Sequence, residues 1–208
     1  MRKKRYVAAL MLVAITLAFA TTTGPNGAGT GTNDASTGTG AWSGPGNITT
    51  ENGVGANASV SSLQTPTQNL QATNFGFSVP AGSVIQGIFV EIKRGSSNAF
   101  VKDNSIKIMK GGVAVGTEHA DTATFWALGF TFAGYGSSSD LWGTIWTSSD
   151  VNASNFGVQI SAQCNQVISD TAFVDFVRIT VTFTPAAGGG QRRIIQTRVS
   201  PSSAQALS

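Results

Sequence analysis

Strict alternation of apolar and polar side chains is the feature of this chain that most restricts its fold. Similar alternation marks residues 84–94, 105–109 and 156–163. The clearest run places Val177, Ile179, Val181 and Phe183 on one side, with Arg178, Thr180 and Thr182 on the other. Such a pattern indicates strands that pack on one face and meet water on the other, as antiparallel sheets permit. The chain therefore reads as all-β.

Short turns rich in Gly, Pro, Asn and Ser separate these runs, and many short strands with such turns indicate a sandwich or a barrel. One cysteine cannot supply the paired cysteines of an immunoglobulin domain. A sharp corner at residues 79–82 precedes a long strand, which favours a jelly roll. We expect an antiparallel two-sheet sandwich, jelly-roll-like, over residues 42–184. We also expect its last two strands, residues 156–163 and 173–183, to pair as a hairpin.

The first 20 residues have the three parts of a secretory signal. The cations at residues 2–5 precede an apolar run from Tyr6 to Phe19 that ends in Ala18-Phe19-Ala20. The run is shorter than the roughly 20 apolar residues of a membrane-spanning helix. We therefore expect residues 1–20 to be a cleaved signal peptide with no stable membrane span, and the product to be secreted or held at the cell surface.

The segments that flank the expected domain have little to bury. Residues 21–41 are mostly Gly and Thr, so ordering them would cost backbone entropy without apolar burial, and we expect a flexible linker. Residues 185–208 read as a Gly-rich linker and a C-terminal tail. Within that tail, residues 192–195 suit addition to a neighbour's sheet edge, which predicts self-association.

The basic isoelectric point comes from the two ends of the chain. Residues 41–184 carry six Lys and Arg side chains against nine Asp and Glu. Nucleic acid binding requires clustered cations on one face, so we expect no nucleic acid partner.

The chain has one cysteine and therefore no internal disulfide, so the domain depends on its apolar core. Cys164 acts either as a small buried apolar residue or as a link between chains.

The sequence contains no recognisable catalytic constellation, and we expect no enzymatic activity. His119 is the only histidine, and no Gly-x-Ser-x-Gly motif accompanies it. We expect no cofactor, with a structural calcium ion as the one alternative, held by Asp121, Asp140 and Asp150. Asp140 and Asp150 also follow serine runs, where carboxylates commonly bind backbone N–H groups at the start of a helical turn.

Four tryptophans are the best candidates for ligand binding: Trp42, Trp126, Trp142 and Trp146. Exposed indole rings stack on sugar rings in carbohydrate-binding modules, and neighbouring Asn, Gln and Asp bind the hydroxyl groups. The competing interpretation is that the same rings fill the core of the sandwich, because large aromatic side chains dominate core packing.

Three blocks of sequence, residues 74–94, 138–160 and 174–183, together carry a resemblance to a known group of proteins. In their order and spacing the chain resembles a family of uncharacterised jelly-roll-like β-sandwich proteins found in phage and environmental bacterial genomes. The resemblance implies a structural or adhesive module of an extracellular or virion surface, without a catalytic motif. The chain departs from that family in having its own predicted signal peptide, which favours a secreted or bacterial surface product.

We therefore expect a secreted, non-enzymatic β-sandwich with a structural or adhesive role at a cell or particle surface, its partner a surface glycan or a protein assembly. One alternative is a carbohydrate-binding module that uses exposed tryptophans. The other is a phage decoration or fibre protein.

Overall fold

The computed structural model describes residues 18–61, 66–164 and 166–186. Most of the predicted leader and the predicted tail beyond Ala186 lie outside the described residues. The strands of the first half are β1 (Thr21–Gly27), β2 (Thr30–Asp34), β3 (Ala56–Val60), β4 (Asn69–Thr73) and β5 (Val84–Ser96). Those of the second half are β6 (Val101–Lys110), β7 (Val113–Val115), β8 (Thr131–Gly136), β9 (Gly157–Cys164) and β10 (Asp170–Thr184). Two short helices, η1 (Pro45–Thr49) and α1 (Ser148–Asn152), complete the fold.

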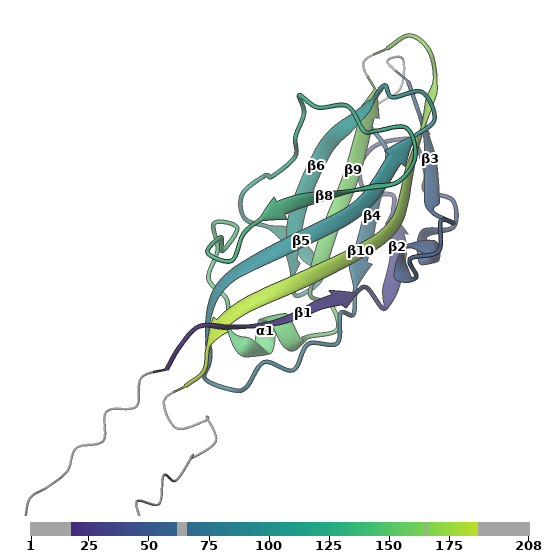
Figure 1. Cartoon of the computed structure of the whole chain (residues 1–208). Helices are drawn as coiled ribbons and strands as arrows, with labels where there is room; N and C mark the ends of the chain where they lie inside the picture. The colour runs from purple at the N-terminus through teal and green to yellow at the C-terminus, as the bar shows by residue number, and fades with distance from the viewer. Residues whose placement is uncertain (1–17, 62–65, 165, 187–208) are drawn as a thin grey trace, which may run out of the picture.

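The strands form two antiparallel sheets that pack face to face, so the predicted sandwich is confirmed (Figure 1). Sheet A has the order β8, β5, β10, and the far edge of β10 pairs with both β1 and β3. Sheet B has the order β2, β4, β9, β6, β7. Almost every connection passes from one sheet to the other, as in a jelly roll.

The core lies between the sheets and consists of the apolar residues predicted from the alternation. From β10, Val177, Ile179 and Val181 are fully buried, and from β9, Val158 and Ile160 face them across the core. A shift of register between Val174 and Phe176 interrupts the alternation of β10. The consequence of this bulge is that residues on its N-terminal side change face.

The prediction of a flexible linker over residues 21–41 is wrong. β1 pairs with β10 and β2 pairs with β4, so each of the two sheets gains a strand from this segment. The Thr and Gly side chains bury little surface, but backbone hydrogen bonds to a strand already in place offset the cost of ordering them. Two apolar residues also anchor this segment in the core: Ala28, between the two strands, and Trp42, directly after the segment, are both buried. The folded domain therefore begins at Thr21.

The predicted hairpin between the last two strands is also wrong. β9 lies inside sheet B between β4 and β6, whereas β10 lies in sheet A beside β5. Residues 165–169 therefore connect two different sheets. Each strand has one apolar face, and alternation records which residues face the core without recording which sheet supplies the partner strands.

The predicted helical turn at Asp150 is present, but its N-cap is Thr147, and Asp150, predicted as the cap, lies inside helix α1. Thr147 Oγ1 accepts a hydrogen bond from the backbone N–H of Asp150, and the Asp150 carboxylate accepts one from the backbone N–H of Thr147. This reciprocal pair is a capping box. Burial raises the pKa of Asp150, but the hydrogen bonds from Thr147 and Lys110 outweigh it, so the pKa lies below its ordinary value.

Replacing Thr147 by Ala is expected to lower the free energy of unfolding by about 1 kcal/mol, because the Asp150 N–H loses its side-chain acceptor and the Asp150 carboxylate loses the Thr147 hydroxyl donor. Urea denaturation measures the change. Ser149→Ala is the matched control, since Ser149 is exposed in the same helix and its replacement should change stability by less than about 0.5 kcal/mol. Equal effects of the two substitutions would contradict the capping role.

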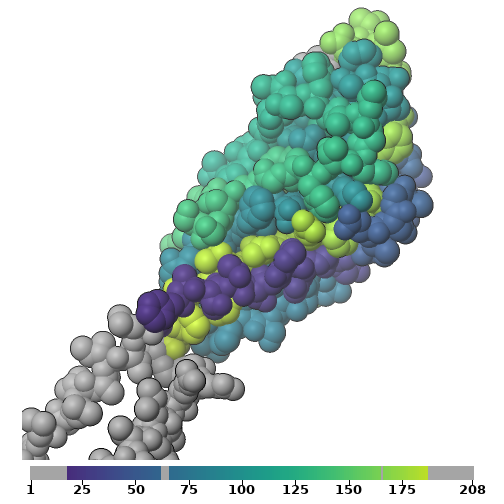
Figure 2. Space-filling view, viewed as in Figure 1, coloured from purple at the N-terminus to yellow at the C-terminus, as the bar shows by residue number. Residues whose placement is uncertain are grey.

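Both described ends of the chain leave the domain at the same pole. Thr21 pairs with Phe183, so the first and last strands lie side by side, purple and yellow in Figure 2. Among the described residues, no helix has the length and apolar character needed to cross a membrane.

Candidate functional site

The four tryptophans proposed as ligand-binding residues are buried, so the prediction that they are exposed is wrong and the core-packing interpretation is confirmed. Their exposed fractions lie between 0 and 6%. Each indole Nε1–H donates to a protein oxygen, as a buried indole requires. The acceptors are Gln68 O for Trp42, Asp103 Oδ1 for Trp126, Ile88 O for Trp142 and Leu141 O for Trp146.

The three carboxylates proposed as calcium ligands are not brought together. Asp121 binds the backbone N–H groups of residues 123 and 124, and Asp150 belongs to the capping box and an ion pair with Lys110. Asp140 accepts from the backbone N–H of Trp142, which confirms the structural role predicted for it. Within the described ranges, no three His, Cys, Asp or Glu side chains are grouped as a metal ion would need.

His119 and Asp140 form a close pair at the surface. His119 Nε2 lies 2.6 Å from Asp140 Oδ2, His119 Nδ1 lies 3.3 Å from Thr117 O, and the ring stacks on Trp142 at 4.1 Å between centroids. Burial raises the pKa of Asp140, but hydrogen bonds from His119 and Trp142 outweigh it, so this pKa is lowered. Both imidazole nitrogens face oxygen atoms of the protein, so the pair joins two loops and leaves neither nitrogen directed at a nucleophile.

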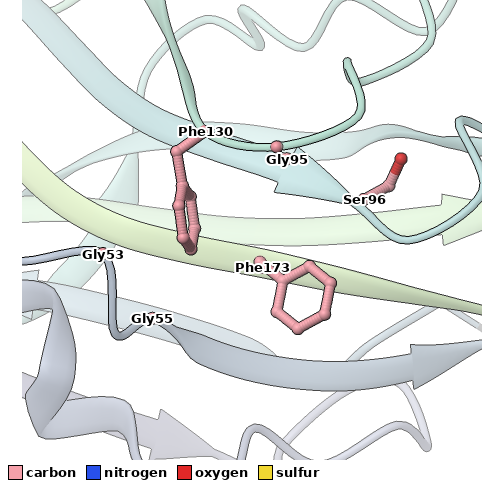
Figure 3. A pocket seen from close by; sticks show the side chains of 7 residues that line it. Gly53, Gly55, Gly95, Ser96, Phe130 and Phe173 are labelled. Atoms are coloured by element: carbon pink, nitrogen blue, oxygen red, sulfur yellow. The ribbon is translucent and has the colours of Figure 1, made fainter.

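The best candidate for a binding site is a groove on the outer face of sheet A, with a volume of about 260 Å³. Its walls are the rings of Phe130 and Phe173, which Figure 3 shows between the backbone of Gly53 and Gly55 on one side and that of Gly95 on the other. The two rings meet edge to face, with 6.2 Å between their centroids. Gly129 and Ser96 complete the lining. We call this site the Phe130–Phe173 groove.

Glycines allow the segments around the groove to approach one another closely. A Cβ atom at Gly95 would lie 2.0 Å from the carbonyl oxygen of Gly129, so no other residue permits the loop before β8 to lie on β5. A Cβ atom at Gly55 would lie 2.8 Å from Val174 O and 3.1 Å from the Phe130 ring. The floor of the groove is therefore backbone, and its aromatic walls are the only large side chains.

A buried carboxylate fixes the loop that forms one side of the groove. Asp175, fully buried at the β10 bulge, accepts from the backbone N–H of Gly53 through Oδ1. Its Oδ2 lies 3.2 Å from Lys93 Nζ, which also binds Glu51 at 2.9 Å. Hydrogen bonds to Glu51 and Asp175 raise the pKa of Lys93. One cation therefore pairs with two carboxylates beside the groove.

The lining of the groove suits binding of one ring-sized apolar group. A cavity of about 150 Å³ holds benzene, while pockets for drug-sized ligands start near 300 Å³, so 260 Å³ fits one ring. No lining side chain is ionisable. The hydroxyl of Ser96 is already engaged, since it donates to Trp126 O and accepts from Ala99 N.

The sequence prediction did not include Phe130 or Phe173. Phe173 lies on β10, where strict alternation with Val177 would place it in the core, but the bulge turns it outward. Phe130 follows directly after Gly129, and an aromatic residue beside a turn glycine is the one feature of the sequence that indicates its role in the groove.

Comparisons with known proteins give no relatives for this chain. No protein-family model matches it, and neither a curated protein nor a solved structure is significantly similar to it.

Proposed function

We propose that this chain is a secreted, non-enzymatic module with a structural or adhesive role at a cell or particle surface, and that it binds its partner through the Phe130–Phe173 groove. The observation that carries the proposal is the groove itself, which combines two aromatic walls with a backbone floor on an exposed sheet face. Such a lining supplies contact area and lacks an acid, a base or a charged side chain with which to transform a ligand.

The position of the groove along the sheet supports a role in attachment. Phe173 is eleven residues from Thr184, the last residue of β10, which lies near the pole shared with Thr21. At about 3.3 Å per strand residue, the groove lies roughly 36 Å from that pole. A module tethered by either end would therefore present the groove away from its tether.

Carbohydrate binding is a second candidate, in a form that no longer uses tryptophan. The groove has the size of a single sugar ring, and half-buried Phe130 offers an aromatic surface for it. Because the Ser96 hydroxyl is already hydrogen-bonded, only backbone groups remain to bind the hydroxyls of a sugar. The groove therefore favours an apolar or aromatic group of a surface protein over a sugar as its ligand. A role in a virion assembly rests on the family resemblance described above.

Replacing Phe130 by Ala should weaken binding to the surface partner about tenfold or more, because one wall of the groove is lost. The experiment measures how much fluorescently labelled protein, residues 21–208, is retained on intact cells and particles of the source. A glycan array tests binding to sugars separately. Binding on the array alone would identify the carbohydrate-binding alternative.

Phe125→Ala is the matched control for this experiment. Phe125 is 42% exposed and packs edge to face on Phe100 at 6.5 Å, much as Phe130 packs on Phe173, but it lies outside the groove. Its replacement should leave retention unchanged. A protein that stays on no surface, or equal losses from both variants, would rule out the groove as the contact.

A further inference from the structure

The outer edge of β8 is an unprotected sheet edge. β8 pairs with β5 on one side, and within the described ranges no hydrogen bond joins its other side to the protein. Proteins commonly protect such edges with Lys, Pro, a bulge or a covering segment, but the sequence of β8, TFAGYG, has no charge and no proline. Phe132 on this strand is 39% exposed.

Each of the other sheet edges either has one of these protections or is very short, which also limits pairing. β1 contains Pro25 and a register shift. β3 is covered where Ser43 exchanges backbone hydrogen bonds with Asn57. In sheet B, η1 packs against β2, and β7 is only three residues long. The edge of β8 differs from all of them.

The backbone groups that β8 leaves unpaired belong to Phe132 and Gly134. On the β8 side of β5, Ile88 N–H donates to Asp140 O and Ser96 N–H donates to Ala127 O. Because backbone direction alternates along a strand, the even-numbered residues of β5 between these points also face β8. Their partners are residues 131, 133 and 135. The N–H and C=O groups of Phe132 and Gly134 therefore point away from the sheet.

The segment that contains this edge is opposite in charge to the C-terminal tail, although the cations Lys93 and Arg178 lie over the Phe132 ring on the face of sheet A. Residues 111–140, which contain β8 and the loop before it, carry Glu118, Asp121 and Asp140 and have no Lys or Arg. Residues 187–208 carry three Arg and no Asp or Glu. Within them, residues 192–199 read RRIIQTRV, a run of eight rich in β-branched side chains, which favour strands.

We propose that residues 192–199 of a second copy of this chain add to sheet A as a strand against the edge of β8. This proposal concerns a surface other than the groove and does not depend on it. Main-chain hydrogen bonds to Phe132 and Gly134 supply the pairing, and the arginines face the acidic loop.

The donor is a second copy because the free edge of β8 lies on the far side of β5 from the end of β10. β5 lies between β8 and β10, and the residues that follow β8 extend along β5: Asp140 O accepts from Ile88 N–H, and the backbone of Ser138 lies on Gly87. The tail of the same chain would have to pass around both to reach the free edge. Strand addition from copy to copy is a head-to-tail contact that generates chains or rings.

The test compares residues 21–208 with residues 21–186, which retain every described strand. Light scattering across a range of concentrations should give oligomers for the longer protein and monomers for the shorter one. Hydrogen exchange should show protection of the amides of Phe132 and Gly134 that rises with concentration. Association should weaken with added salt, since charge pairs are screened.

Two substitutions at one position separate edge pairing from side-chain contact. Phe132→Pro removes the edge N–H and should abolish oligomers, whereas Phe132→Ala keeps the N–H and should retain them, with thermal unfolding confirming that each variant is folded. Monomers at all concentrations, or oligomers that survive removal of the tail, would overturn the proposal. So would amide protection independent of concentration, because it would place the chain's own tail on β8.

Discussion

Replacing Asp103 by Ala is expected to lower the free energy of unfolding by about 3–5 kcal/mol, because the substitution leaves a buried cation without its counter-ion. Asp103 is fully buried on β6, and Arg94 Nε on β5 lies 3.6 Å from its Oδ1. The carboxylate also accepts from Trp126 Nε1 at 2.7 Å and Tyr135 Oη at 2.9 Å. Trp126 and Tyr135 lose this acceptor in the variant, while Arg94 keeps only its hydrogen bond to Tyr135 Oη.

This cluster joins the two sheets, which is why its loss affects the whole domain. Asp103 belongs to sheet B, while Arg94 and Tyr135 belong to sheet A. The Arg94 guanidinium also lies over the Trp126 ring, 4.8 Å from its centroid. Burial, followed by the negative charge of Asp103, raises the pKa of Tyr135 well above its ordinary value, so the phenol remains a neutral donor.

Urea denaturation at neutral pH measures the effect, with Asp121→Ala as the control. The Asp121 side chain is exposed, and its backbone N–H still donates to Asp103 in that variant, so we expect a loss of no more than about 1 kcal/mol. Replacing Arg94 by Met and Asp103 by Leu together should restore much of the stability lost on removing Asp103 alone. An Asp103→Ala protein as stable as the Asp121→Ala control would disprove the role of the pair.

Replacing Asp170 by Ala should cost about 3 kcal/mol at neutral pH, since one buried carboxylate is the shared acceptor of several donors in a partly buried turn. Asp170, nearly fully buried at the start of β10, holds the turn between β5 and β6. Its carboxylate accepts from the backbone N–H groups of Ser97, Asn98 and Phe100 and from the Ser97 hydroxyl at 2.6 Å.

The same carboxylate predicts a dependence of stability on pH. Burial raises the pKa of Asp170, but the hydrogen bonds from Ser97, Phe100, Thr171 and Asn98 outweigh it, and the pKa lies below the ordinary value of 3.8. A carboxyl group with a lowered pKa in the folded state stabilises the fold above its unfolded pKa. This contribution is lost as the pH falls through the folded pKa. The difference between the wild-type protein and Asp170→Ala should therefore shrink below pH 3.8.

Denaturation midpoints of the two proteins from pH 7 down to pH 2 measure this effect. Asp170→Asn is the comparison variant, because it keeps one acceptor oxygen and removes the titrating group. We expect it to be intermediate in stability at neutral pH. A stability difference between wild type and Asp170→Ala that stays constant across the acid range would contradict the assignment.

The sequence was sufficient to predict the class of fold but not the partners of each strand. Alternation along Val177, Ile179 and Val181 predicts a one-sided strand, and these residues form the core. Alternation contains no information on which strand lies alongside, so β9 and β10 were wrongly paired. β1 and β2 were missed because their side chains are small and polar, and backbone pairing is what orders them.

The candidate site was less predictable, for a reason that Phe173 illustrates. Its orientation depends on the bulge at Asp175, where the carboxylate accepts a hydrogen bond from Gly53 in a loop 122 residues earlier. The four tryptophans were conspicuous in composition, yet composition does not distinguish an indole that packs in the core from one that meets a ligand. Exposure of a ring is a property of the assembled sandwich.

The pairing of β10 has a consequence for how the chain acquires its structure. This strand is the common partner of β1, β3 and β5, so none of the three can complete sheet A before residues 170–184 exist. Pairing across such long sequence separations is slow because distant segments must first meet. During synthesis the pairing of β1, β3 and β5 with β10 therefore waits until residues 170–184 have been made, and sheet A closes around β10 in a late step.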